Sequence, residues 1–371
     1  MALTRLANPA LVNVREPNFR NIIINGNMQI AQRATSVASI SSGNTIHTCD
    51  RWKTYASSAG TWTQTQEALT SGDAYNDGFS TSLKLDCTTA NGSLSAGSYL
   101  SVAQSIEAQN LQYIKKGTSN AEQLTASFWV KSTKTGTNIL QLVSLDDTVR
   151  ICAKSYTISS SNTWEKKTIT FPADTSSTGS IDNNNGEGMR MIFWVAAGTD
   201  YTSGSLATTW ADTVNANRAV GQINNADSTS NNFEITAVQL EAGSVATDFE
   251  VVPDGQNLER CLRYYYVHAE GNTKQIGSGG YYNSTYVTCT LQFPQEMRAA
   301  PSLIKTTGTD YYGIYRDNTV DTFNDFNNGI QNATTTSCGM DCSANVSGTS
   351  GWYGRVITYN ASASIAFSSE L

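Results

Sequence analysis

The sequence predicts an all-β protein organised as an N-terminal arm, a jelly-roll β-sandwich, a short linking helix and a smaller C-terminal β-sandwich head. Three observations predict this fold class. Short apolar–polar alternations of period two recur along the chain, separated by polar turns. Only 15% of the 371 residues are charged, and Ser, Thr, Asn and Gly are abundant, which favours strands and polar loops. A helical period is clear only near residues 253–266.

The length and charge of the chain limit its organisation and its partners. A chain of 371 residues leaves room for two or three domains. The formal net charge of −7 and the lack of a basic stripe argue against nucleic acid, because phosphate binding needs clustered Lys and Arg. The sequence has no apolar run of about 18 residues and no signal-peptide pattern at its start. We therefore expect a soluble protein with no membrane insertion and no signal-peptide export.

The cysteines predict neither a disulfide framework nor a zinc site. Their number, seven, is odd and they are scattered. Cys338 and Cys342 are close, but no second Cys or His pair accompanies them, as a structural zinc site requires. We expect the cysteines to be small buried apolar side chains in a protein made in a reducing cytosol.

The first 20 residues differ from the rest of the chain. Residues 1–20 contain Pro9 and Pro17 and show no sustained period, which predicts an extended arm that either docks on a partner or stays loose. The next segment predicts a hairpin, with an apolar run at Ile22 to Ile24, a turn at residues 25–27 and a second strand through Met28.

Residues 21–252 predict the jelly roll. About ten short strands with polar turns and no long helical period favour a β-sandwich. Examples are the alternations at residues 83–87 and 124–130 and the apolar strand at residues 139–145. A long Thr/Ser/Asn/Ala segment, residues 197–232, carries Trp210 as its large apolar anchor, which is typical of an ordered surface excursion or a functional loop.

The stretch from Phe233 to Arg263 separates two β regions. Apolar residues change face at Ala237–Val238, which predicts a β-bulge. Pro253 then starts a helical linker, residues 253–266, with one apolar stripe. We expect this stripe to face sister chains or the base of the head, as a collar that sets the head on the jelly roll. The collar residues are Leu258, Cys261, Leu262 and Tyr265.

Residues 267–371 predict the C-terminal head. Val287, Cys289, Leu291 and Phe293 share one face of a strand, and the alternation at residues 361–367 predicts another. No catalytic motif accompanies them. The chain has two histidines, His47 and His268, and neither stands in a recognisable motif, so we predict no catalytic residue and no cofactor.

Two chemical alternatives stay open at this point. Paired carboxylates for sugar hydrolysis are possible because the sequence does not show their spacing in space. Oxygen-rich loops at residues 73–78 and 182–187 offer ligands to Ca²⁺, although they lack EF-hand spacing and are equally typical of plain turns. We therefore assign no metal site.

Aromatic residues of the head are the candidate receptor contacts. A flat aromatic ring stacks on the apolar face of a sugar while neighbouring polar groups bond its hydroxyls. The alternative is that tyrosines in a β domain belong to the edge of the core or to a subunit interface. The candidates are Tyr281, Tyr282, Tyr311, Tyr312, Tyr315, Trp352 and Tyr353.

Several stretches resemble bacteriophage tail-fibre or receptor-binding proteins that begin with a jelly roll like that of carbohydrate-binding modules. These stretches are NIIINGNMQIAQRATS, TIHTCDRW at residues 45–52, NRAVGQINNADSTSNNFEITAVQLEAG, the junction FEVVPDGQNLERCLRYYY, FPQEMRAAPSL and the terminal SSEL. The resemblance implies a homotrimeric appendage on the exterior of a virion. Residues 1–20 would attach to other virion proteins, and the distal head would touch a host surface glycan or protein. It transfers no sugar-binding residue.

Three functions follow from these expectations. The first is a non-enzymatic phage tail fibre, or adhesin, that presents residues 265–371 to a host receptor. The second is a capsid or tail decoration protein in which the jelly roll is only a scaffold. The third is a polysaccharide depolymerase, against which the lack of a long parallel β-helix pattern counts.

Overall fold

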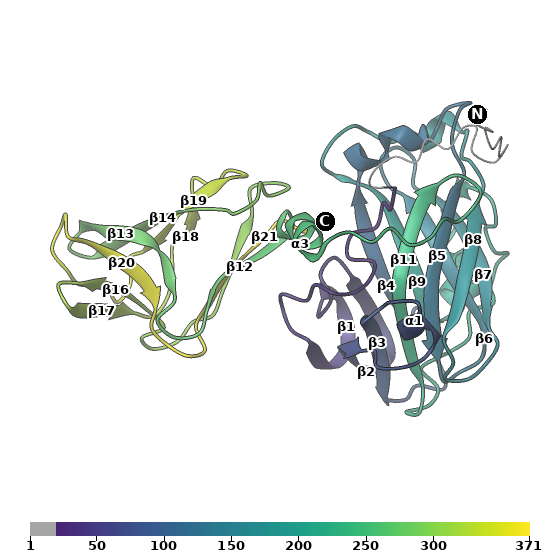
Figure 1. Ribbon diagram of the computed structural model, residues 1–371, viewed down its shortest axis with the longest axis horizontal. Coiled ribbons are helices and arrows are strands. Elements are labelled where there is room, and N and C mark those ends of the chain that lie inside the picture. Colours follow the sequence, from purple (N-terminus) through teal and green to yellow (C-terminus); the bar gives the residue numbers. More distant parts are fainter. Residues whose placement is uncertain (1–19) are drawn as a thin grey trace, which may run out of the picture.

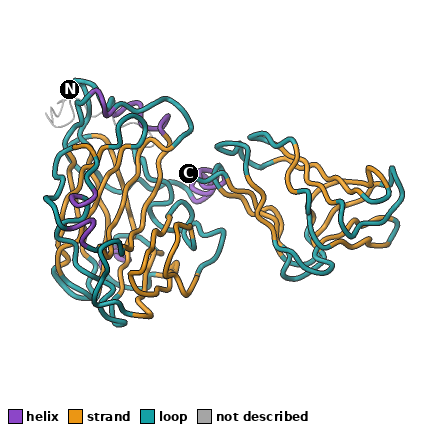
Figure 2. Tube along the Cα trace, turned by 180° about the vertical axis from the view of Figure 1, so that it is seen from behind, coloured by secondary structure: helices purple, strands orange, loops and turns teal. Residues whose placement is uncertain are grey.

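The computed structural model describes residues 20–371 and shows two β regions joined by a short helix (Figure 1). The expected arm at residues 1–20 lies outside the described residues, apart from Arg20. We call residues 20–252 the first region and residues 265–371 the head. Helix α3 and the C-terminal residues lie between the two regions (Figure 1). Strands are the main regular secondary structure of both regions, and helices are limited to short pieces (Figure 2).

The first region holds eleven strands, and the all-β expectation is confirmed. Its strands are β1 (Ser36–Ile46), β2 (Lys53–Ala68), β3 (Thr81–Thr89), β4 (Tyr99–Glu107), β5 (Leu124–Ser132), β6 (Gly136–Ser144), β7 (Arg150–Ile158), β8 (Glu165–Phe171), β9 (Glu187–Ala197), β10 (Ala211–Asp212) and β11 (Asn232–Ala242). Its helices are α1 (Asp73–Asn76), α2 (Thr199–Thr202), η2 (Ala108–Ile114), η3 (Ser177–Gly179) and η4 (Asn215–Asn217).

One long strand, β2, carries the chain from one layer of a sandwich to the other. Residues 53–57 of β2 pair with β4, whereas residues 61–68 pair with β3. The bend between them places Gly60 at φ 78°, and a Cβ there would meet the Thr89 carbonyl oxygen at 2.4 Å, so glycine is required. The bend in β2 therefore folds the sheet into two facing layers. Its strands are hydrogen-bonded in the order β10-β7-β6-β9-β4-β2-β3-β11-β5-β8.

The core of the first region lies between these layers. Phe128 of β5 meets Phe193 of β9 edge to face, with ring centroids 4.9 Å apart. Trp52 packs on the other side of Phe193 at 6.2 Å. All three side chains are almost completely buried. The predicted inward residues of the 83–87 and 124–130 strands belong to the same cluster, which confirms those alternations.

The expected hairpin at residues 21–30 is wrong. The segment turns at residues 25–27 but contains no strand. Amide side chains take the main-chain hydrogen bonds that a strand partner would take: Gln104 accepts from Ile24 N–H at 2.7 Å and donates to its carbonyl oxygen at 2.8 Å. Asn21 Oδ1 likewise accepts from the N–H of Leu240 at 3.1 Å. An apolar run thus stays buried without a ladder.

The predicted bulge in β11 is confirmed. The pairing of β11 with β5 shifts register between Thr236 and Gln239, and Ala237 has φ 52°. Phe233 and Ile235 before the bulge and Val238 after it all enter the main core.

Helix α3 (Asp254–Leu262) is shorter than the expected linker, because Tyr265 already pairs with Ser368 in the first strand of the head. Its stripe also differs from the expectation. Cys261 and Tyr265 are buried within their own chain and are not available to a sister chain, whereas Leu258 is exposed and Leu262 half-buried. The face that packs inward includes Asn257, whose side chain accepts from the N–H of Asn25 at 3.2 Å. Counting apolar residues misses such a polar contact.

The head is a second, smaller sandwich. Strands β12 (Tyr265–Glu270), β21 (Ser364–Ser368) and β15 (Ser302–Lys305) form one sheet. The other sheet contains β13 (Gln275–Asn283), β14 (Tyr286–Gln292), β16 (Tyr312–Arg316), β17 (Thr319–Phe323), β18 (Gly329–Gln331), β19 (Ser337–Cys342) and β20 (Tyr353–Thr358). Phe367 of the first sheet packs against Phe293, which follows β14, at 4.9 Å, so the core closes between the two sheets.

Charged groups connect the two regions. Arg263 donates to both carboxylate oxygens of Glu107, at 2.8 and 2.9 Å, and the Tyr264 hydroxyl donates to the same carboxylate. Arg51 pairs with Glu370 close by. The terminal stretch SSEL therefore packs on the first region.

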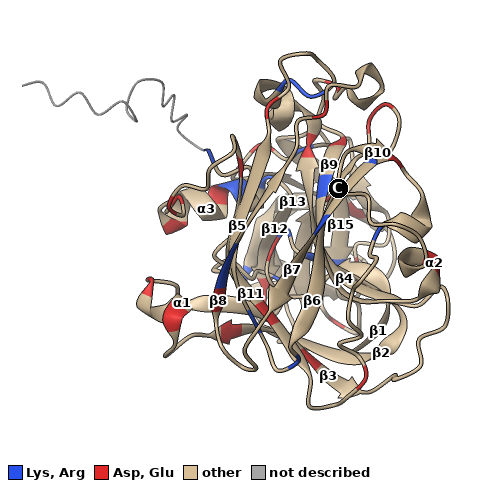
Figure 3. Ribbon diagram, turned by 90° about the vertical axis from the view of Figure 1, so that its right-hand side faces the viewer, with Lys and Arg blue, Asp and Glu red and all other residues tan. Residues whose placement is uncertain are grey.

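The remaining whole-chain expectations concern cysteines and charge. All seven cysteines are free and buried, as predicted. Basic and acidic residues are scattered over the face seen in Figure 3, with acidic residues at α1. No helix within residues 20–371 is long and apolar enough to cross a membrane.

Candidate functional site

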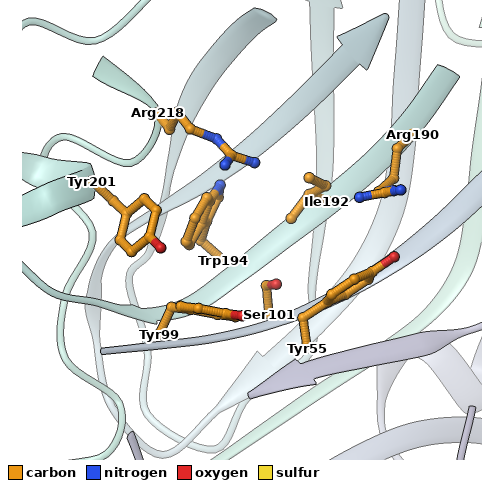
Figure 4. Close-up of a pocket in the computed structure, with 8 residues that line it drawn as sticks. All are labelled: Tyr55, Tyr99, Ser101, Arg190, Ile192, Trp194, Tyr201 and Arg218. Atoms are coloured by element: carbon orange, nitrogen blue, oxygen red, sulfur yellow. The ribbon is translucent and has the colours of Figure 1, made fainter. Parts of the chain in front are cut away.

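A hollow of about 150 Å³ opens on the outer face of the first region, on the side of β4 and β9 that faces away from the core (Figure 4). Strand alternation places its residues. In β9, Met191, Phe193 and Val195 enter the main core, so Ile192 and Trp194 point outward. We call this hollow the groove. Its lining residues are Tyr55, Tyr99, Ser101, Arg190, Ile192, Trp194, Tyr201 and Arg218.

The long segment at residues 197–232 supplies one wall of the groove. It forms α2 and η4, and it covers a second apolar cluster on the outer face that includes Ile139, Trp194 and Ala219. The N–H of Ala219 donates to the Tyr201 carbonyl oxygen at 2.9 Å, which fixes the neighbouring Arg218 beside Tyr201. The excursion is thus ordered, and it carries two residues of the groove.

Three aromatic rings meet at one end of the groove. Tyr201 lies edge to face with Tyr99 at 5.6 Å and tilts against Trp194 at 5.3 Å between centroids. Figure 4 shows Tyr99 and Tyr55 along one side, with the two arginines on the other side at either end of Ile192. These rings are held by one another and by the sheet, so their faces and edges are in place before any ligand arrives.

The two arginines of the groove differ in their partners. Arg190 donates to both oxygens of Glu187, at 2.7 and 2.5 Å. Burial opposes its charge, but these hydrogen bonds outweigh burial and raise the pKa of Arg190. Among the described residues, the hydrogen-bond acceptor of the Arg218 side chain is Gln141 Oε1, at 3.4 Å from two of its nitrogens, and burial lowers the pKa of Arg218. Its charge also lies 5.2 Å from the centre of the Trp194 ring.

The groove supplies binding groups and no acid–base pair. Burial raises the pKa values of Tyr55 and Tyr201, so their hydroxyls stay protonated and can donate and accept hydrogen bonds. The eight lining residues include no Asp, Glu, His or Cys. Stacking rings, hydroxyls and guanidinium groups are the chemistry by which a surface holds a sugar ring. A volume of this size accepts about one six-membered ring at a time.

Two of the seven predicted receptor contacts lie in the core of the head. Tyr281 is 3% exposed and donates from its hydroxyl to Asp321 at 3.0 Å. Tyr312 is completely buried and donates to the Thr306 carbonyl oxygen at 2.6 Å. Both are core residues, so the expectation of direct receptor contact is corrected for them. Alternation decided this, because the two tyrosines fall on inward positions of β13 and β16.

The other five predicted contacts are at least partly accessible. Tyr282 and Tyr353 are 75% and 77% exposed, and Trp352 is 44% exposed with the Arg316 guanidinium 3.8 Å over its ring. Tyr311 and Tyr315 are half-buried. Tyr282 and Trp352 belong to neighbouring strand ends, because Trp352 accepts from the N–H of Tyr281.

The two candidate Ca²⁺ loops form turns. In the loop at residues 182–187, Asn184 Oδ1 accepts from the N–H of Gly186 at 2.7 Å, and the loop at residues 73–78 contains α1. Across residues 20–371, no three His, Cys, Asp or Glu side chains gather in a way that suits a metal ion.

Sequence reasoning missed the groove. Residues 191–195 form one continuous apolar run, which hides that Trp194 points away from the core. A usable signal existed: Tyr55, Tyr99 and Trp194 occupy the outward positions of their strands, where a solvated sheet face normally carries small polar residues. Strand β4 itself was not predicted.

No family model matches this sequence, and no curated protein matches it. Similar solved structures include the enzymatically active domain of tailspike protein 4 from bacteriophage CBA120, at 15% identity and TM-score 0.30, covering 60% of this chain. This chain spans only 22% of that domain's length. A family 11 carbohydrate-binding module of a Clostridium thermocellum cellulase has 12% identity and TM-score 0.26, with 56% of this chain and 98% of that module covered. A tandem of family 22 modules from Paenibacillus barcinonensis has 7% identity and TM-score 0.27, with coverages of 94% and 88%.

Proposed function

We propose that this chain is a non-enzymatic glycan-binding protein and that the groove of the first region holds one sugar ring of the glycan. The observation that carries the proposal is the cluster of Tyr99, Trp194 and Tyr201, in which the Tyr201 ring contacts the other two rings beside a ring-sized hollow. Hydroxyls and guanidinium groups surround them, and no carboxylate lines the hollow. Such a set binds a sugar without supplying the two carboxylates that most glycosidases use.

The biological setting we propose is a phage tail fibre, in line with the resemblance at the junction sequence. In this proposal residues 1–20 attach to the virion, residues 21–252 form the glycan-binding jelly roll, residues 253–266 link it to the head at 267–371, and three copies assemble. Leu258 and Leu262, four residues apart on α3, are the apolar collar positions that the chain's own fold leaves accessible. A homotrimer would cover them.

The trimer is tested by light scattering at micromolar concentration with the full chain. We expect Leu262→Asn to weaken the trimer and leave the first region folded, with exposed Lys115→Asn as the control substitution. A monomeric wild-type protein would contradict the trimer and leave the glycan proposal intact. Antibody labelling of virions separates a tail fibre from a decoration protein, which would label capsid faces.

The glycan proposal is tested by binding of the full chain to a glycan array, followed by calorimetric titration with a retained oligosaccharide. Tyr99→Ala should weaken binding roughly 10-fold, because one stacking surface is lost. Tyr353→Ala in the head is the matched control and should leave the affinity unchanged. No retained glycan, or sugar release from the array, would contradict non-enzymatic glycan binding.

The head is a second candidate receptor site, favoured by the exposure of Tyr282 and Tyr353. Exposed rings at neighbouring strand ends can meet a host glycan or protein that the groove does not bind. The test is whether the soluble chain competes with virions for adsorption to host cells. If the head is the receptor site, Tyr353→Ala and Tyr282→Ala should abolish this competition, whereas Tyr99→Ala should not. If the chain that carries both Tyr282→Ala and Tyr353→Ala still competes fully, the head is not the receptor site.

A further inference from the structure

We propose that the sugar in the groove is acidic, and that its anionic substituent is held by Arg218. The inference rests on the proposed glycan-binding function and names the class of sugar. It starts from a guanidinium group that the fold places at the groove wall and leaves without a carboxylate partner.

The partners of Arg218 within residues 20–371 are few. Two of its nitrogens donate to the single oxygen of Gln141, each at 3.4 Å, and no carboxylate lies within salt-bridge distance. A guanidinium group carries five N–H donors, so three of those of Arg218 have no acceptor within residues 20–371. Gln141 Oε1 is itself shared, because Trp194 Nε1 also donates to it at 3.1 Å.

Three other arginines show how this chain can compensate such a charge. Arg190 at the opposite end of the groove is paired with Glu187, and Arg263 with Glu107. Arg298 has no carboxylate partner either, but it donates to three main-chain oxygens, at 2.6, 2.9 and 3.3 Å. Arg218 therefore differs from Arg190, Arg263 and Arg298 in having unused N–H donors at the groove.

Burial makes this arrangement costly without a ligand. Arg218 is half-buried against the faces of Trp194 and Tyr201, at 5.2 and 5.9 Å from the ring centres, and its pKa is lowered because burial disfavours the charge. A carboxylate entering the groove would supply both the missing charge and the missing acceptors, and a guanidinium fork matches a carboxylate with two parallel hydrogen bonds.

The geometry also limits the kind of acidic glycan. The hollow accepts about one ring, and the ring cluster of Tyr99 and Trp194 offers its apolar faces beside Arg218 (Figure 4). The whole chain carries a net charge of −7, which repels a densely charged polymer. These facts favour a glycan in which one acidic sugar stands among neutral ones, over a polymer charged at every unit.

The test uses an array of matched oligosaccharide pairs with the full chain. Each pair differs at one sugar: glucuronate against glucose, galacturonate against galactose, and a sulfated or phosphorylated sugar against the unmodified one. We expect an acidic member to bind at least about 10-fold more tightly than its neutral partner. The modified pairs distinguish a carboxylate from a sulfate or phosphate.

Substitution of Arg218 then tests the assignment. Arg218→Gln should reduce the preference for the acidic member to less than about threefold, whereas Arg218→Lys should restore part of the preference. Lys166→Gln, on β8 in the opposite layer, removes the same charge and should change nothing. Raising the salt concentration should weaken only the acidic member, which provides a readout with the wild-type protein if Arg218→Gln does not fold.

The outcomes separate the two proposals. Equal affinity for acidic and neutral members, with Tyr99→Ala still weakening both, overturns the acidic-sugar inference and keeps the glycan function. An acidic preference that persists in a folded Arg218→Gln protein also overturns the assignment to Arg218. Binding to no member of the array overturns the proposed function itself.

Discussion

The first region and the head both present aromatic residues outside their main cores, but they hold them differently. In the groove, Tyr201 contacts both Tyr99 and Trp194, and all three rings are at least half-buried. In the head, Tyr282 and Tyr353 project with about three quarters of their surface exposed. The difference comes from the ordered excursion at residues 197–232, which covers the sheet face beside the groove.

This difference separates a preorganised site from an exposed one. Rings that are already fixed lose little side-chain entropy when a ligand binds. More of the free energy of their contacts therefore remains as binding affinity. Exposed rings must be ordered by the ligand, and they suit a larger partner that covers several of them at once. Three changes test how far the two regions behave as separate units.

The largest effect is expected from Phe193→Ala, beneath the groove. Phe193 packs on Phe128 and Trp52, and removal of such a buried ring costs about 3–5 kcal/mol of unfolding free energy. Trp352 is the only one of the seven tryptophans beyond residue 252, so tryptophan fluorescence during denaturant unfolding follows mainly the first region. That transition should move to lower denaturant.

The matched control is Phe326→Ala in the core of the head, where Phe326 is fully buried. It should destabilise the head and leave the main fluorescence transition in place. A single transition that moves equally in both variants would show that the two regions unfold as one unit.

An intermediate effect is expected from Glu107→Gln at the contact between the regions. The buried carboxylate accepts from Arg263 and Tyr264, and loss of its charge should lower stability by roughly 1–3 kcal/mol at neutral pH. Limited proteolysis of residues 243–264 should become faster. Glu122→Gln, in an exposed pair with Lys115, should leave stability unchanged.

The same substitution predicts a pH dependence. Burial opposes the charge of Glu107, but its hydrogen bonds from Arg263 and Tyr264 outweigh burial and hold its pKa below the ordinary 4.5. The carboxylate therefore stabilises the fold above that pH, and this stabilisation is lost as the pH falls through the lowered pKa. The stability difference between wild type and Glu107→Gln should shrink on acidification. Burial raises the pKa of Asp50 to about 6, so protonation of Asp50 on acidification favours the folded state. This contribution is the same in wild type and Glu107→Gln, and it cancels in the stability difference.

The smallest effect is expected from Tyr353→Ala in the head. Its ring is 77% exposed, so the unfolding free energy should change by no more than about 0.5 kcal/mol. Tyr281→Ala, on the adjacent strand β13 but in the core, provides the contrast and should destabilise the head clearly. Equal losses in thermal unfolding would mean that Tyr353 packs against something other than solvent.

Much of the fold was predictable from local pattern. The β-bulge at Ala237, the inward faces of β3, β5 and β14 and the change of region near Pro253 follow from alternation and turn residues, which depend on neighbours in the chain. The hairpin at residues 21–30 was predicted wrongly because side-chain amides of distant residues, such as Gln104, bond its main chain. Strands β1 and β4 were missed because their polar residues weaken the pattern.

The sequence by itself determined the all-β class, the two β regions and the short helix, because strand alternation is a local property with a fixed period. It also marked aromatic residues as the binding chemistry. Only the tertiary structure decided which aromatic residues come together: Tyr55, Tyr99, Trp194 and Tyr201 come from four separate segments, and sheet pairing with the packed excursion brings them to one face. The same packing placed Arg218 beside them, with no carboxylate of residues 20–371 in salt-bridge contact with it. Such convergence depends on long-range contacts, which no local spacing in the chain encodes.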